Sequence, residues 1–204
     1  MESCKLIVMG ASMGGIVAVE RVLSWLPSGF QTPVAVVMHR SVDSTEGLVQ
    51  TLRKHSTLRL REPHDKEPIE PGCVYFAPPD YHLMVEPGSF ALSTDAPELY
   101  ARPSIDVLFE TAADAYGPGV VAVVMTGASS DGARGAAKVK ASGGVVVVQD
   151  PASAEAPLMP QAAIRMTKTD KVLSLDGIGE FLCSKCGVVN EPNANRANPS
   201  QYTQ

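Results

Sequence analysis

Long apolar runs and clusters of positive charge are both missing from this sequence. None of its 204 residues lie in an apolar run long enough to span a membrane as a helix, so membrane insertion is not expected. Lys and Arg form no run and the formal net charge is −5, which argues against nucleic acid as a partner. Aromatic residues make up only 5% and charged residues 19%, whereas 45% are apolar. This composition is typical of a soluble globular protein with one core.

Cysteine is also sparse, with residues at positions 4, 73, 183 and 186. Cys4 adjoins one predicted strand and Cys73 begins another, so both are interpreted as small core side chains. Cys183 and Cys186 form a C-x-x-C pair, but no second pair or suitable histidine follows, and no metal site is predicted. The opening MESCKLIVMG does not resemble a signal peptide, so a reducing cytoplasm is the expected location.

Short apolar runs alternate with helical patterns along most of the chain. Buried strands are predicted at 6–9, 34–38, 120–125 and 145–148, and a shorter strand at 171–175. Helices are predicted at 14–26, 44–55, 104–116, 131–141, 157–166 and 177–182. Three extended pieces at 74–77, 83–86 and 90–92, separated by Pro and Gly, predict a small antiparallel insert.

This alternation predicts an α/β fold. We expect a doubly wound, mostly parallel sheet in a Rossmann-like three-layer sandwich, carrying the antiparallel insert. Residues 1–182 are expected to form one domain. Residues 183–204 are polar and end in a stretch rich in Asn and Pro, so they are expected to be a disordered tail.

A glycine-rich turn, Gly10-Ala11-Ser12-Met13-Gly14-Gly15, follows the first predicted strand. It partly matches the dinucleotide fingerprint G-x-G-x-x-G, but Ser12 replaces the glycine that lets the backbone approach a pyrophosphate. The acidic residue expected after the second strand is also absent, and His39 stands there. A phosphate-binding or purely structural turn nevertheless remains an alternative.

The same turn also matches G-x-S-x-G, in which glycines allow a strained turn that exposes a serine hydroxyl. Ser12 would then lie at a helix N-terminus, where free N–H groups favour a developing oxyanion. Ser12 is therefore a candidate nucleophile.

His39 and Asp131 each have an ordinary alternative, as a surface histidine and as an N-cap of the helix that follows. Their combination with Ser12 changes the interpretation. All three follow predicted parallel strands at the same end of the sheet, where ligands bind in such folds. They are also the residue types of a nucleophile, a general base and an orienting carboxylate. The order Ser, His, Asp differs from that of α/β-hydrolases, so that fold is not expected.

Several further stretches occur in a specific order. They are GASMGG at 10–15, VVMHR at 36–40, PGCVYFAPPDYHLMV at 71–85, RPSIDVLFETAADAYG at 102–117, TGASSDGARG at 126–135 and QDPASAEAPLMPQAAI at 149–164. Through them, residues 5–182 resemble the catalytic domain of the bacterial chemotaxis protein-glutamate methylesterases (CheB-type methylesterases).

The resemblance implies a serine hydrolase that removes methyl groups from glutamate esters on the cytoplasmic helices of chemoreceptors, and that in many members also deamidates glutamines. It implies Ser12, His39 and Asp131 as the catalytic triad. Met13, Gly14, Gly127 and Ala128 are expected at or near the oxyanion site, and no cofactor is required. Methylated chemoreceptor helices are the expected partners.

Two departures from the family accompany the resemblance. Ala128-Ser129 stands where the family usually has Met-Gly, which affects the surroundings of the reacting serine. The first catalytic strand begins near residue 6, so a stand-alone domain without a preceding receiver domain is expected. Two rivals follow from these observations: a nucleotide- or phosphate-binding module, and a receptor-binding relative without turnover.

Four other polar residues are weaker candidates. His82 either lines the cleft or lies on a surface strand. Arg40, Arg102 and Arg134 lie near the ends of the site-bearing segments and either steer an acidic substrate or are ordinary solvated arginines.

Overall fold

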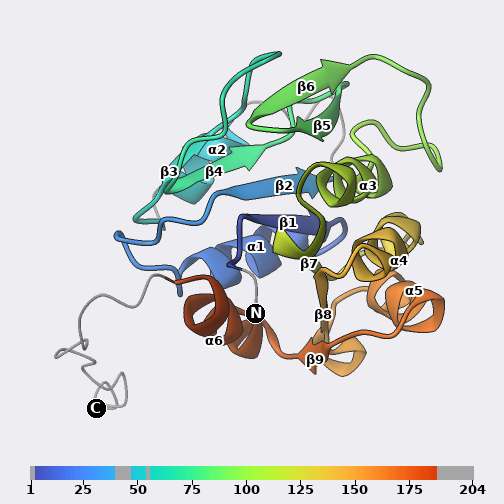
Figure 1. Cartoon of the computed structure of the whole chain (residues 1–204). Helices are drawn as coiled ribbons and strands as arrows, with labels where there is room; N and C mark the ends of the chain where they lie inside the picture. The colour runs from blue at the N-terminus through green and yellow to red at the C-terminus, as the bar shows by residue number, and fades with distance from the viewer. Residues whose placement is uncertain (1–2, 40–46, 54–55, 188–204) are drawn as a thin grey trace, which may run out of the picture.

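A seven-stranded parallel sheet forms the centre of the molecule (Figure 1). The computed structural model describes residues 3–39, 47–53 and 56–187. The strand order is β3-β4-β2-β1-β7-β8-β9. The strands are β1 (Leu6–Ala11), β2 (Val34–Met38), β3 (Arg59–Arg61), β4 (Cys73–Phe76), β7 (Val120–Val124), β8 (Val145–Gln149) and β9 (Lys171–Leu173). Strands β2, β4 and β3 lie on one side of β1, with β4 inserted between β2 and the edge strand β3, and β7, β8 and β9 lie on the other side. The sheet therefore reverses its winding between β1 and β7.

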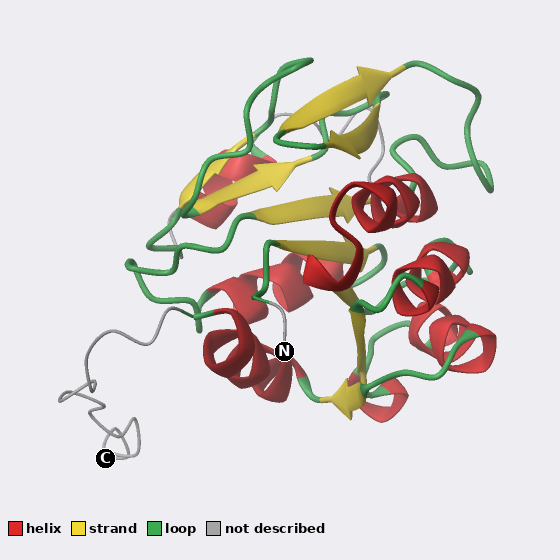
Figure 2. Ribbon diagram, in the orientation of Figure 1, coloured by secondary structure: helices red, strands yellow, loops and turns green. Residues whose placement is uncertain are grey.

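Helices cover both faces of this sheet (Figure 2). One face packs against α1 (Gly15–Leu23), α2 (Leu48–Arg53) and α6 (Leu175–Cys186), and the other against α3 (Ile105–Tyr116), α4 (Ala133–Ala141) and α5 (Leu158–Met166). The alternation of strand side chains produces the two cores: Ile7 and Met9 of β1 face the first layer, whereas Leu6 and Val8 face the second. The predicted doubly wound three-layer fold is confirmed.

The antiparallel insert is smaller than predicted. It consists of β5 (His82–Glu86) and β6 (Ser89–Ser93), which pack beside α3. The segment predicted at 74–77 belongs instead to the parallel sheet, where β4 pairs with both β2 and β3. Strand β3 was not predicted, because Leu60 lies between two arginines and is its only buried residue.

The C-terminal helix and the cysteines also differ from expectation. Helix α6 continues through Cys186, past the boundary predicted at 182, and residues 188–204 of the predicted tail lie outside the described residues. Cys4 forms a disulfide with Cys186, so its role is not limited to packing, and the cysteine argument for a reducing compartment is weakened. Cys73 is buried in the core, as predicted. No helix within the described ranges is long and apolar enough to cross a membrane.

Candidate active site

The three candidate triad residues follow neighbouring strands of the sheet. Ser12 follows β1, His39 follows β2 on one side of it, and Asp131 lies in the loop after β7 on the other side. Because the strands are parallel, all three lie at one edge of the sheet, at the point where its winding reverses. This is the place where doubly wound folds bind their ligands.

Backbone hydrogen bonds fix Ser12 between its two neighbours. The His39 N–H donates to the Ala11 carbonyl at 3.0 Å, and the Ser12 N–H donates to the Thr126 carbonyl at 2.9 Å. The Thr126 hydroxyl in turn donates to the Met13 carbonyl at 2.8 Å. Gly14 caps α1 with a φ of 74°, a left-handed conformation that glycine adopts readily. The glycine-rich turn therefore has a defined shape, with Ser12 half-buried at its start.

Free backbone N–H groups surround this turn. Within the described residues, the N–H groups of Met13, Gly14 and Ala128 donate no hydrogen bond, which leaves them available to an oxyanion. The Gly127 N–H is already bound to the Ala156 carbonyl at 2.9 Å, so Gly127 cannot supply a donor. Gly127 contributes space instead, since a Cβ there would lie 2.9 Å from the Ser12 Cβ.

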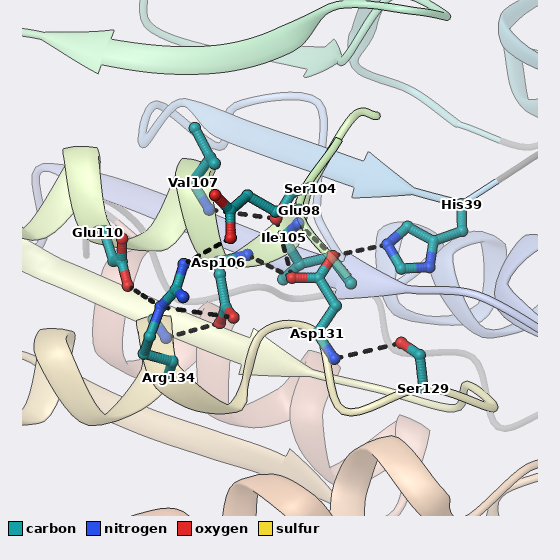
Figure 3. Close-up of polar contacts among 11 residues, drawn as sticks. His39, Glu98, Ser104, Ile105, Asp106, Val107, Glu110, Ser129, Asp131 and Arg134 are labelled. Carbon is teal, nitrogen blue, oxygen red and sulfur yellow. Dashed lines mark hydrogen bonds and ion pairs between the residues drawn. The ribbon is translucent and has the colours of Figure 1, made fainter. Parts of the chain in front are cut away.

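His39 and Asp131 are in direct contact (Figure 3). The His39 Nε2 lies 2.7 Å from the Asp131 Oδ2. An ionised carboxylate only accepts hydrogen bonds, so Nε2 carries the proton, and Nδ1 is the basic nitrogen of the neutral ring. Figure 3 shows this second nitrogen directed away from Asp131. The contact meets the requirement that a carboxylate orient the base.

The N-terminus of α3 binds the carboxylate of Asp131. Oδ1 accepts from the Ser104 hydroxyl and the Asp106 N–H, both at 2.9 Å, and Oδ2 accepts from the Ile105 N–H at 2.7 Å (Figure 3). Asp131 is fully buried. Burial raises the pKa of its carboxyl, but hydrogen bonds from His39, Ile105 and Asp106 outweigh that effect, and the net pKa lies below the ordinary value. Asp131 is therefore held ionised. It is not the N-cap of α4, a role that Gly132 fills.

Ser104 and His82 form a second layer behind this carboxylate. Ser104 is fully buried and caps α3, as the sequence predicts. Its N–H donates to the His82 Nδ1 at 3.2 Å, and the His82 Nε2 lies 3.2 Å from the Ala96 carbonyl oxygen. His82 is thus buried behind the site, and its interpretation as a surface residue is wrong.

Asp106 is a second buried carboxyl close to Asp131. Its Oδ1 accepts from the Gly135 N–H at 2.7 Å. Burial raises its pKa to about 6, and the charge of Asp131 adds to this effect, whereas Gly135 and Arg134 oppose it. Two neighbouring carboxyls therefore have pKa values shifted in opposite directions, a pattern typical of functional sites.

Ser12 lies where the predicted triad requires it, directly after β1 and between the strands that precede His39 and Asp131. Within the described residues, however, its hydroxyl makes no hydrogen bond to His39. Catalytic hydrogen bonds are often long before substrate binds, so this geometry is compatible with the triad. The role of Ser12 stays a prediction.

The predicted arginines have structural partners. Arg102 pairs with Asp80 at 2.6 Å and also binds two backbone carbonyls. Arg134 pairs with Glu110 at 2.6 Å and with Glu98 at 3.4 Å. Neither is a freely solvated arginine, and Arg40 lies outside the described residues.

Sequence reasoning did not find the supports of the site. Ser104 was predicted only as a cap, and Thr126 and Gln149 were not singled out, although the Gln149 side chain binds the Thr126 N–H at 2.8 Å. For Thr126 and Gln149, the signal is a polar residue at the end of an apolar run. Ser129 accepts the Asp131 N–H at 3.2 Å, so the departure from the family pattern at this position helps to hold the acid loop.

Three comparisons with known proteins agree with this geometry. The family model described as CheB methylesterase matches residues 7–182. A Leptospira interrogans protein, provisionally named protein-glutamate methylesterase/protein-glutamine glutaminase, is 45% identical over 176 residues, which cover 86% of this chain and 91% of that protein. A Pseudomonas putida enzyme of the same name is 34% identical, over 89% of this chain and 49% of its own length.

A solved structure is also similar. The crystal structure of the Thermotoga maritima CheB methylesterase catalytic domain superposes with a TM-score of 0.85 and 34% identity, covering 90% of this chain and 99% of that one. The protein described here belongs to the CheB methylesterase family.

Proposed function

We propose that this protein is a serine hydrolase that demethylates glutamate methyl esters on the cytoplasmic helices of chemoreceptors, and that it also deamidates glutamines there. The contact between His39 and the buried, ionised Asp131 carries the proposal. It lies beside the glycine turn that presents Ser12. A phosphate-binding module would leave this contact without a purpose.

The proposed reaction assigns one task to each residue. His39 removes the Ser12 proton through Nδ1 as the hydroxyl oxygen attacks the ester carbonyl. Asp131 holds the ring orientation and stabilises the imidazolium. The N–H groups of Met13 and Ala128 bind the oxyanion. The imidazolium protonates the departing methoxide, methanol leaves, and water activated by His39 hydrolyses the acyl-enzyme to glutamate and free Ser12.

The substrate also implies a location. Action on the cytoplasmic part of a receptor places the protein in the cytoplasm. The Cys4–Cys186 disulfide is unusual for that compartment, and chemical quantification of thiols in freshly lysed cells tests whether it forms there.

Methanol release from a methylated receptor fragment tests the proposed activity. Wild-type protein should release methanol, and Ser12→Ala should reduce the rate by about three orders of magnitude or more, because removing a nucleophile leaves only binding and oxyanion stabilisation. Ser3→Ala, an exposed serine outside the site, is the matched control and should keep the wild-type rate. An undiminished rate in Ser12→Ala would contradict the proposal.

A further inference from the structure

His82 is a buried histidine to which the proposed reaction assigns no task. It is 2% exposed and begins β5, the first strand of the antiparallel hairpin. The hairpin packs on α3, where the Val85 N–H donates to the Thr111 hydroxyl at 3.0 Å. His82 therefore lies where the hairpin meets the helix whose N-terminus binds Asp131.

The N-terminus of α3 has several backbone donors that need acceptors, because the first N–H groups of a helix have no intrahelical partner. Asp131 accepts from the N–H groups of Ile105 and Asp106. The Ser104 hydroxyl accepts from the Val107 N–H at 3.5 Å. The N–H of Ser104, the N-cap residue, also needs an acceptor, and Ser104 is fully buried, so bulk water does not supply one.

His82 supplies the acceptor for this last donor. The Ser104 N–H donates to the His82 Nδ1 at 3.2 Å. Many helices use instead a Glu or Gln three residues after the N-cap, whose side chain reaches back to the N-cap N–H. In α3 that position holds Val107, whose side chain has no acceptor atom. A residue of the hairpin, about 20 positions earlier in the chain, therefore takes over a task that helices usually perform locally.

The contacts of His82 assign its protonation state. Because Nδ1 accepts the Ser104 N–H, it carries no proton, and the proton of the neutral ring lies on Nε2. Nε2 lies 3.2 Å from the Ala96 carbonyl oxygen, an acceptor that matches this tautomer. A neutral acceptor suits this place, because a carboxylate would add a further negative charge beside Asp131.

Ser104 thus has one anchor for its backbone and another for its side chain. The backbone N–H binds His82, and the hydroxyl donates to Asp131 at 2.9 Å. The next two N–H groups of the same turn also bind Asp131, so all three donors move with this piece of backbone. Without an acceptor, the Ser104 N–H would have to shift toward a new one, and the donors to Asp131 would shift with it. Asp131 in turn orients His39 through their contact of 2.7 Å.

We propose that His82 is a positioning residue for the hydrolytic reaction. Its neutral ring holds the backbone of Ser104, which places three donors around Asp131, and Asp131 orients His39. His82 acts through this chain of hydrogen bonds, so it affects the reactivity of Ser12 and not the binding of substrate. This inference rests on the proposed function and extends it to a residue of the antiparallel insert.

Two variants of the same shape separate this role from simple packing. Asn and Leu have the same branched outline, but His82→Asn keeps an acceptor near the position of Nδ1, whereas His82→Leu has none. In His82→Asn, kcat for methanol release from a methylated receptor fragment should stay within about threefold of wild type. In His82→Leu, kcat should fall at least tenfold with KM unchanged, because a small displacement of catalytic groups slows the reaction itself. Labelling of Ser12 by a small fluorophosphonate should fall in the same proportion as kcat.

His64→Asn is the matched control, since His64 is exposed and lies outside the site. It should change neither rate. Nitrogen-15 NMR of the histidine rings in the wild-type protein adds a measurement that requires no variant to fold. The neutral His82 ring should carry its proton on Nε2, with Nδ1 unprotonated.

Rates are compared per folded molecule, with the folded fraction taken from circular dichroism. A kcat in His82→Leu that equals or exceeds that of His82→Asn overturns the positioning role, because a side chain that only fills space is replaced as well by Leu as by Asn. A His82 ring with its proton on Nδ1 overturns the role as well. Failure of the proposed function is recognised separately, because wild-type protein would then release no methanol at all.

Discussion

Replacing Ser104 with Ala should weaken both the fold and the site through Asp131. The change removes one of four hydrogen-bond donors to a fully buried carboxylate, at a distance of 2.9 Å. A hydrogen bond to a charged acceptor contributes about 1.5–3 kcal/mol to the free energy of unfolding. Ser104 also caps α3, but its bond to the Val107 N–H is long, at 3.5 Å. Losing that cap adds about 0.5 kcal/mol, the low end of measured values.

The pH dependence of the lost free energy of unfolding separates the two roles of Ser104, as a hydrogen-bond donor to Asp131 and as the N-cap of α3. The folded-state pKa of Asp131 lies below its ordinary value of 3.8. Hydrogen bonds to the ionised carboxylate therefore stabilise the fold above that pH, and their contribution is lost as the pH falls through the folded-state pKa. The deficit of Ser104→Ala should be complete at pH 7 and shrink below the ordinary value of 3.8, whereas a capping deficit does not depend on pH.

Urea unfolding of both proteins, from pH 7 down through the folded-state pKa of Asp131, measures the deficit at each pH. Groups that are unchanged by the substitution contribute equally in both proteins, so the difference in free energy of unfolding between wild type and variant isolates the effect on Asp131. Ser104→Thr keeps the hydroxyl and should restore most of the stability and the rate of Ser12 labelling. A deficit that stays constant across this range would refute the assigned link between Ser104 and Asp131.

Two further variants test the surroundings of the site. The raised pKa of Asp106, about 6 against an ordinary 3.8, means that wild-type protein gains stability as the pH falls from 6 toward 4, by about 3 kcal/mol. Asp106→Asn should remove this rise from urea unfolding curves, and a variant that retains it would contradict the assignment. Gly127→Ala places a Cβ 2.5 Å from the Met159 Cε and 2.9 Å from the Ser12 Cβ, so fluorophosphonate labelling of Ser12 should slow at least tenfold. Gly29→Ala, which enters open space, should label at the wild-type rate, and equal rates in the two variants would show that Gly127 does not shape the site.

The sequence predicts the centre of the fold better than its edges. Strands β1, β2, β7 and β8 are buried on both faces, so each appears as an uninterrupted apolar run. At the edge, β3 alternates Arg59, Leu60 and Arg61 and gives no such signal. The Cys4–Cys186 bond joins residues 182 positions apart, and no local pattern predicts that pairing.

The site also has parts that the local sequence predicts and parts that depend on distant residues. The positions of Ser12, His39 and Asp131 could be predicted because Ser12 and His39 directly follow strands and Asp131 lies in the loop after another. The parallel order of these strands brings their ends together. The support from α3 could not be predicted, because Asp131 accepts hydrogen bonds from the N-terminus of a helix that lies about 25 residues earlier in the chain. The local sequence predicted Asp131 as a cap for the helix after it, and only the packing of α3 against α4 decides otherwise.

Mass spectrometry of the protein after reaction with a fluorophosphonate tests the central assignment most directly. A nucleophile activated by His39 and Asp131 should carry the adduct on Ser12, with no adduct in Ser12→Ala and labelling slowed at least a hundredfold in His39→Gln. An adduct on a different residue, or equal labelling of Ser12 with and without the imidazole, would contradict the account.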